Sequence, residues 1–147
     1  MEYKEYLLQL IDEFDRVCRD NGLRYFLTGG SLLGAIRHNG MIPWDDDIDV
    51  AMPREDYEKL RQMAKEVFAS DFSFITNNED ADYFLCYAKL FHNHTTLVEL
   101  QDPFYLGGVY LDVFPIDGLP SNKYLSMIHY KRFYFWRNMS YIVARND

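Results

Sequence analysis

Four aspartates fall within five consecutive positions of the stretch Met41-Ile-Pro-Trp-Asp-Asp-Asp-Ile-Asp-Val-Ala51. In an extended strand the side chains alternate between faces, so Asp47 and Asp49 share one face while the residues between and after them turn toward a core. Neighbouring carboxylates repel and raise each other's pKa, which is costly unless a cation neutralises them. A hard divalent ion, Mg²⁺ or Mn²⁺, completed by substrate phosphates, is the usual solution in phosphoryl and nucleotidyl transfer.

Two other interpretations of this acidic stretch are a solvated loop and a calcium loop. A charge run usually marks a solvated loop, but this run is interrupted by one isoleucine and followed by apolar residues, which indicates half-burial. Asp45, Asp47 and Asp49 have the 1, 3, 5 spacing of an EF-hand, which requires Gly at the sixth position and a bidentate Glu at the twelfth. Val50 and Asp56 stand there instead, so the calcium loop does not fit.

The elements that must position these acids begin with an amphipathic helix over 3–20, where apolar residues recur at helical spacing. Residues 23–28 are predicted as a short strand that runs into Gly29-Gly30-Ser31 and then into a helix over 32–37. Backbone N–H groups at such a turn can hold an anion, with Ser31 capping the helix and offering a hydroxyl. An ordinary tight turn also explains the same three residues, and on these residues alone we favour that interpretation.

The second half of the sequence predicts a helix after Pro53 and several strands rich in aromatic and β-branched residues. The predicted strands are Phe72–Thr76, Tyr83–Phe91, Thr95–Leu100 and Val109–Phe114. In the last of them Asp112 is an isolated acid among apolar residues. Such an acid is seldom buried alone, so either a basic group pairs with it or it completes the metal site, and we favour the metal.

Composition and charge narrow the class of protein. A chain of 147 residues with 48% hydrophobic and 17% aromatic content fits one folded domain and excludes disorder. The formal charge of −8 argues against a general nucleic-acid binder. Residues 121–147 are instead basic, with five Lys or Arg and one acidic residue, which is consistent with a surface that binds a partner. Cys18 and Cys86 form no CxxC pair and no secretory leader is evident, so reduced thiols and a cytoplasmic location are expected.

Three blocks of the sequence, in order, resemble the LicD family, which is related to the fukutin-like proteins. The blocks are Phe26–Gly40, Ile42–Arg54 and Gly108–Pro120, and the segment Lys89–Thr96 is similar to the stretch that the family places between them. The resemblance covers most of residues 20–120.

This resemblance implies an α+β fold, a nucleotidyltransferase-like mixed β-sheet flanked by α-helices, for residues 1–120. Residues 121–147 would then begin a C-terminal helical region, and we expect the chain to stop short of the family's usual length. In this superfamily an Asp-x-Asp pair and a third acid on a later strand are catalytic and bind the divalent metal. They correspond here to Asp47, Asp49 and Asp112, with Mg²⁺ or Mn²⁺ as cofactor, whereas Asp45 and Asp46 either supplement the site or cap the turn.

The activity implied by the resemblance is that of a phosphotransferase of the EC 2.7 class. Members move a phosphocholine-type phospho-alcohol from a CDP-activated donor onto a cell-surface glycan such as lipopolysaccharide or teichoic acid, in some cases lipid-linked. A glycan hydroxyl would attack the β-phosphorus and expel CMP, with metal neutralising the phosphates. Two alternatives remain: a non-catalytic relative that binds a nucleotide or partner, and a true nucleotidyltransferase that releases pyrophosphate.

Further residues are candidates for binding the substrate. Gly29, Gly30 and Ser31 would hold phosphate, and Arg37 and Lys89 would act as phosphate clamps, with plain surface charge as the alternative for these two cations. His92 and His94 share a spacing that can bind zinc, which we disfavour because no third ligand is apparent. Trp44, Tyr83, Tyr87 and Tyr110 could cage a quaternary ammonium, although aromatic residues more often form core.

The basic, aromatic segment over 121–145 is predicted to be a helix capped by Ser121. Lys131, Arg132 and Arg137 interrupt every window of about 20 residues, so it is not expected to span a membrane. It could lie on an anionic membrane surface, which would place the protein at the inner face of the membrane, or it could pack on a neighbouring helix. We favour packing.

Overall fold

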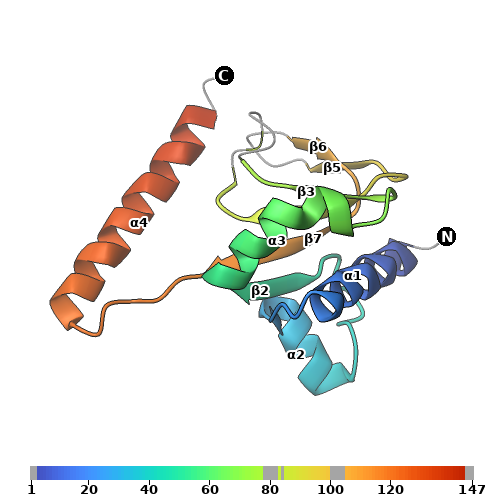
Figure 1. Ribbon diagram of the computed structural model, residues 1–147, viewed down its shortest axis with the longest axis horizontal. Coiled ribbons are helices and arrows are strands. Elements are labelled where there is room, and N and C mark those ends of the chain that lie inside the picture. The colour runs from blue at the N-terminus through green and yellow to red at the C-terminus, as the bar shows by residue number, and fades with distance from the viewer. Residues whose placement is uncertain (1–2, 78–82, 84, 100–104, 145–147) are drawn as a thin grey trace.

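The chain forms an α+β structure around a mixed five-stranded sheet, as the sequence predicts (Figure 1). This computed structural model describes residues 3–77, 83, 85–99 and 105–144. In chain order the elements are α1 (Tyr3–Asp20), β1 (Phe26–Leu27), α2 (Gly29–His38), β2 (Asp49–Pro53), α3 (Arg54–Val67), β3 (Phe72–Ile75), β4 (Ala88–His92), β5 (Leu97–Glu99), β6 (Tyr105–Gly107), β7 (Tyr110–Ile116) and α4 (Lys123–Ala144).

The main sheet has the strand order β1-β2-β7-β4-β3. β2 and β7 run parallel, and the other neighbouring strands run antiparallel. β5 and β6 form a separate two-stranded sheet. β7 is therefore central, between the strand that carries Asp49 and the strand that carries Lys89.

The core lies between this sheet and the helices α1 and α3. Apolar residues at helical spacing place one stripe of α1 inside, because Leu7, Leu10, Phe14 and Val17 are fully buried. α1 packs against β4 and β7, and α3 packs against β2, β3 and β7. The α1 and α3 stripes meet the fully buried side chains of the central strands, so the sheet is fixed from the side that the helices cover.

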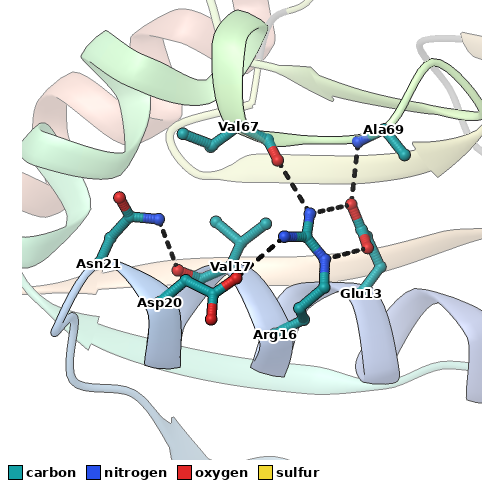
Figure 2. A network of polar contacts seen from close by, with 7 residues as sticks. All are labelled: Glu13, Arg16, Val17, Asp20, Asn21, Val67 and Ala69. Carbon is teal, nitrogen blue, oxygen red and sulfur yellow. Dashed lines mark hydrogen bonds and ion pairs between the residues drawn. The ribbon is translucent and has the colours of Figure 1, made fainter.

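A polar network ties α1 to the end of α3 (Figure 2). The Arg16 guanidinium donates to the Val67 carbonyl at 2.9 Å and to both carboxylate oxygens of Glu13, at 2.7 and 2.8 Å. Glu13 in turn accepts the Ala69 N–H at 2.9 Å. Carbonyl groups in the last turn of a helix lack partners within that helix, so Arg16 provides one and stabilises the end of α3.

Several predicted boundaries are wrong. β1 is much shorter than the predicted strand over 23–28, and β4 begins at Ala88 rather than Tyr83 among the described residues. β6 was not predicted, because the segment between the predicted strands contains Pro103 and Gly107-Gly108 and was interpreted as a connection. Position 84 and Leu100 belong to predicted strands but lie outside the residues that the structure describes.

The predicted helix caps are also wrong. α2 begins at Gly29 with Thr28 as its N-cap, so Ser31 lies inside the first turn. At α4 the cap is Asn122 instead of Ser121, because the Asn122 carboxamide oxygen accepts the Tyr124 N–H at 2.9 Å. Asn and Ser are both good N-cap residues, and sequence alone did not separate two adjacent ones.

α4 lies away from the rest of the chain, joined by an extended segment after β7 (Figure 1). Its aromatic and aliphatic side chains are largely exposed, with Trp136 at 64% and Tyr124 at 73%. Within the described residues, no helix is long and apolar enough to cross a membrane.

Candidate functional site

The adjacent parallel strands β2 and β7 bring two of the predicted acids together. Asp49 and Asp112 are partners in the strand register. The Asp112 N–H donates to the Ile48 carbonyl at 2.9 Å, which fixes that register at the acidic end of β2. Neighbouring strands lie about 4.8 Å apart, so the register makes the two acids direct neighbours on the sheet.

The remaining acids lie in the loop between α2 and β2. Asp47 precedes β2, so it is not part of the strand as predicted, although burial still alternates from Asp47 through Val50. Carboxylate oxygens of Asp45, Asp46 and Asp47 lie within 4.8 Å of one another. Sequence reasoning left Asp45 and Asp46 uncertain, and the geometry places them in the acidic cluster.

In this cluster, burial and the neighbouring carboxylates disfavour the charged forms of Asp47 and Asp49. Burial raises the pKa of Asp49 to about 6, with further contributions from Asp47 and Asp45. Burial, followed by Asp45 and Asp46, also raises the pKa of Asp47. Half-buried carboxylates that repel one another are the donor set that a hard divalent cation prefers, so the residues fit Mg²⁺ or Mn²⁺.

The glycine turn at the start of α2 lies directly against these acids. Gly29 has a φ of 54°, and a Cβ added there would collide with a carboxylate oxygen of Asp49. A Cβ on Gly30 would be 2.6 Å from Asp45 Oδ2. Ser31 holds the turn to the strand, because its Oγ accepts the Asp49 N–H at 2.9 Å. The two glycines therefore let the N-terminus of α2, which favours negative charge, approach the carboxylates.

Lys89 of β4 lies on the other side of Asp112. It is the register partner of Asp112 and is only 2% exposed. Its Nζ is 3.5 Å from Asp112 Oδ1 and 3.1 Å from the centroid of the Tyr110 ring. Of the two partners that the sequence offered for Asp112, the basic group is therefore present, and metal binding by Asp112 stays a prediction.

Arg37, the second predicted phosphate clamp, is exposed in the last turn of α2. At 1.5 Å per residue it is about 12 Å along the helix from Gly29. It therefore lies far along α2 from the glycine turn, and its role as a phosphate clamp stays a prediction.

The two histidines do not share a strand face. β4 ends at His92, which is buried and lies 3.0 Å from Gln9 through its Nε2. His94 is in the following turn, with its Nε2 3.0 Å from Asp71 Oδ1. Burial lowers the pKa of His92, which favours its neutral form. The ring centroids of His92 and His94 are 5.8 Å apart, and each ring also has a partner of its own, Gln9 or Asp71.

The four aromatic residues proposed as a cage have separate surroundings. Trp44 is 82% exposed with His38 as ring neighbour, whereas Tyr83 is 2% exposed. Tyr87 packs on Phe114, with the ring centroids 4.5 Å apart. The Lys89 ammonium covers one face of the Tyr110 ring, so that face is not open to a ligand cation.

Two ion pairs that join separate segments of the chain were not foreseen. Arg54, at the start of α3, makes a bidentate pair with Asp117 after β7, with distances of 2.7 and 2.6 Å. Arg24 donates to the buried Asp56 at 2.7 Å. Arg54 and Asp117 both lie in blocks that resemble a known family, but their pairing depends on the parallel register of β2 and β7. Both pairs lie at the end of β2 opposite to Asp49, so they support the strands that carry the acids without contacting the acids themselves.

A family profile and individual proteins of known name both match this chain. The sequence profile of the LicD/FKTN/FKRP nucleotidyltransferase domain matches residues 22–141. The lipopolysaccharide cholinephosphotransferase LicD of Haemophilus influenzae is 34% identical over 115 residues, which are 78% of this chain and 43% of that protein.

Shorter matches reach eukaryotic proteins. Human ribitol 5-phosphate transferase FKRP is 52% identical over 42 residues, 29% of this chain and 8% of that protein. Mannosyltransferase regulator 4 of Saccharomyces cerevisiae is 37% identical over 62 residues, 42% of this chain and 5% of that protein. The chain thus matches less than half of the length of each of these relatives.

Proposed function

The chain belongs to the LicD/FKTN/FKRP family, and from this premise we propose that it is a metal-dependent phosphotransferase acting on a CDP-activated phospho-alcohol and a glycan hydroxyl. The observation that carries the proposal is the pairing of Asp49 with Asp112 across adjacent strands, next to Asp47 and the start of α2. The names of two relatives, a cholinephosphotransferase and a ribitol 5-phosphate transferase, support transfer of a phospho-alcohol.

In this proposal Asp47, Asp49 and Asp112 hold Mg²⁺ or Mn²⁺, which neutralises charge on the donor phosphates. The exposed backbone of Gly29 and Gly30, with Ser31 fixing the turn, receives a donor phosphate at the N-terminus of α2. The name of the Haemophilus influenzae relative, a cholinephosphotransferase, supports phosphocholine as the group that is transferred.

The reaction exchanges one phosphorus–oxygen bond for another. The glycan hydroxyl oxygen bonds to the β-phosphorus, and the bond from that phosphorus to the bridging oxygen breaks, so CMP leaves. The hydroxyl proton passes to an acid of the cluster, Asp112 or a neighbour.

The test is a calorimetric titration of CDP-choline, other CDP-alcohols and CTP into the chain, with Mg²⁺, with Mn²⁺ and with EDTA. We expect metal-dependent binding of a CDP-alcohol that Asp47→Asn abolishes. Equal binding in EDTA, or unchanged metal affinity in both Asp47→Asn and Asp49→Asn, contradicts the proposed site.

A second candidate function is a non-catalytic relative that assists another enzyme. It is favoured by the match to a yeast protein named as a mannosyltransferase regulator. Product analysis separates the candidates: CMP indicates phospho-alcohol transfer, pyrophosphate indicates nucleotidyl transfer, and donor binding without either product indicates the regulator.

A further inference from the structure

Lys89 has surroundings that are unusual for a lysine. It lies in the middle of β4, where all five residues are buried, and β4 itself lies between β3 and β7. Lysine is almost never fully buried unless it is paired, because an ammonium loses its hydration there. A specific interaction must therefore compensate for this position.

The compensation comes from two groups on the neighbouring strand β7. The Lys89 Nζ is 3.5 Å from Asp112 Oδ1, and it lies over the Tyr110 ring at 3.1 Å from the centroid. The carboxylate supplies a counter-charge and the ring supplies a cation–π contact, which is stronger where water is excluded. The ammonium is thus held from two sides against the acid that the proposed site needs.

The charge of Lys89 also acts on the rest of the acidic site. It lowers the pKa of Asp47 and of Asp49, opposing the effects of burial and of the neighbouring carboxylates. Lys89 therefore interacts with each of the three acids proposed to hold metal, although it comes from a different strand.

We infer that Lys89 is a built-in counter-cation, a positioning residue that orients the Asp112 carboxylate and limits how tightly the site binds a metal ion. This inference rests on the proposed function. A divalent ion bound by Asp112 is repelled by the ammonium, so the ion binds weakly by itself and more tightly once donor phosphates add negative charge. Metal and donor consequently bind together.

The experiment measures Mn²⁺ binding by calorimetry, and thermal unfolding in EDTA and in Mn²⁺, for the wild type and three variants. Lys89→Met removes the charge and keeps the stem. Lys89→Arg keeps the charge. Lys59→Met is the matched control, because the Lys59 side chain is 65% exposed and its Nζ is 3.7 Å from Asp56, outside the acidic cluster.

We expect Lys89→Met to bind Mn²⁺ about tenfold more tightly than the wild type, since a repelling charge next to the ion is gone. Its melting temperature falls in EDTA, because the buried carboxylate has lost its cation, and Mn²⁺ raises it by more than in the wild type. Lys89→Arg and Lys59→Met keep the wild-type Mn²⁺ affinity to within about twofold.

Unchanged or weaker Mn²⁺ affinity in Lys89→Met, with only a lower melting temperature, would show a purely structural lysine and overturn the inference. Should Lys89→Met be unfolded in EDTA, the inference requires that millimolar Mn²⁺ restore the native circular dichroism spectrum, and failure to restore it overturns the inference. A wild type that binds no Mn²⁺ contradicts the proposed function itself, which distinguishes the two failures.

Discussion

At the scale of single residues, the acidic site is stabilised less well than the rest of the molecule. The pKa of Asp49 is raised to about 6, first by burial and then by Asp47 and Asp45. A raised pKa in an acid means that its charged form is disfavoured in the folded chain. At neutral pH the metal-free protein therefore holds Asp49 ionised at a cost, which a bound cation would remove.

The first prediction concerns this cost. In EDTA near pH 7.5, Asp49→Asn should increase the free energy of unfolding by about 1 kcal/mol, because it removes a repelled charge while keeping the side-chain shape. Urea unfolding measures it, with Asp12→Asn on the exposed face of α1 as the control, expected near zero. A less stable Asp49→Asn variant would mean that the carboxylate has a favourable partner and would speak against a repulsive site.

The second prediction concerns the glycine that faces Asp49. Gly29 and Gly22 have similar positive φ angles, 54° and 64°, but only Gly29 has the Asp49 carboxylate where a Cβ would lie. Each Gly→Ala change should cost about 1–2 kcal/mol of unfolding free energy through backbone strain. Only Gly29→Ala should also weaken Mn²⁺ binding, since it displaces the Asp49 carboxylate, and equal Mn²⁺ affinity in the two variants would contradict this role for Gly29.

At the scale of elements, polar contacts at helix ends hold α1, α3 and the segment before β1 together. Arg16 joins α1 to the end of α3 (Figure 2), and Arg24, just before β1, joins that segment to the first turn of α3 through Asp56. α3 follows directly after β2, the strand that carries Asp49. α3 therefore holds the end of β2 that is opposite to Asp49.

The third prediction is that Arg16→Met destabilises the fold by about 1–2 kcal/mol, because the Val67 carbonyl and the Glu13 carboxylate lose a shared donor. Arg19→Met is the matched control. Among the described residues, Arg19 pairs with Asp15 in the same helix, and its side chain is 78% exposed, so its loss should cost less than about 0.5 kcal/mol. Urea unfolding compares the two variants, and equal costs would refute the tie between the helices.

The fourth prediction is a pH dependence of the pair between Arg24 and Asp56. The hydrogen bond from Arg24 lowers the pKa of the Asp56 carboxyl. A lowered pKa in an acid stabilises the fold above the unfolded value, about 3.9, and this contribution disappears as pH falls through the folded value. Arg24→Met should therefore be less stable than the wild type by about 1 kcal/mol at pH 6, with the gap closing toward pH 3. A gap independent of pH, measured by urea unfolding, would assign the loss to packing.

Sequence patterns predicted the elements whose own residues decide them. The helical spacing of Leu7, Leu10 and Phe14 predicts α1, and the alternation around Asp112 predicts the faces of β7, because burial on one side is a local property of the pattern. The contact between Lys89 and Asp112 was not predictable in this way. It depends on the register between β4 and β7, which tertiary packing sets and neither strand's sequence encodes alone.

At the scale of the whole molecule, the chain divides into a compact body that holds the site and a helix that stands apart from it (Figure 1). The core cluster contains no described residue of α4. The described contacts of α4 with the body include a distance of 3.9 Å between Cys86 Sγ and Ser140 Oγ. The extended segment after Asp117 joins the two parts.

The last prediction follows from this division. A chain shortened to residues 1–118 keeps the core cluster, the acids and the bidentate pair of Arg54 with Asp117. Its free energy of unfolding should lie within about 1 kcal/mol of the full chain, because hydrophobic stabilisation follows the apolar area buried and α4 leaves most of its apolar side chains exposed. Its Mn²⁺ affinity should also be unchanged. Urea unfolding and calorimetry test both, with Ser140→Ala in the full chain as the control for the contact at Cys86. A shortened chain that unfolds or loses Mn²⁺ would show that α4 supports the site through the body, and the acids would then depend on the C-terminal helix as well as on β2 and β7.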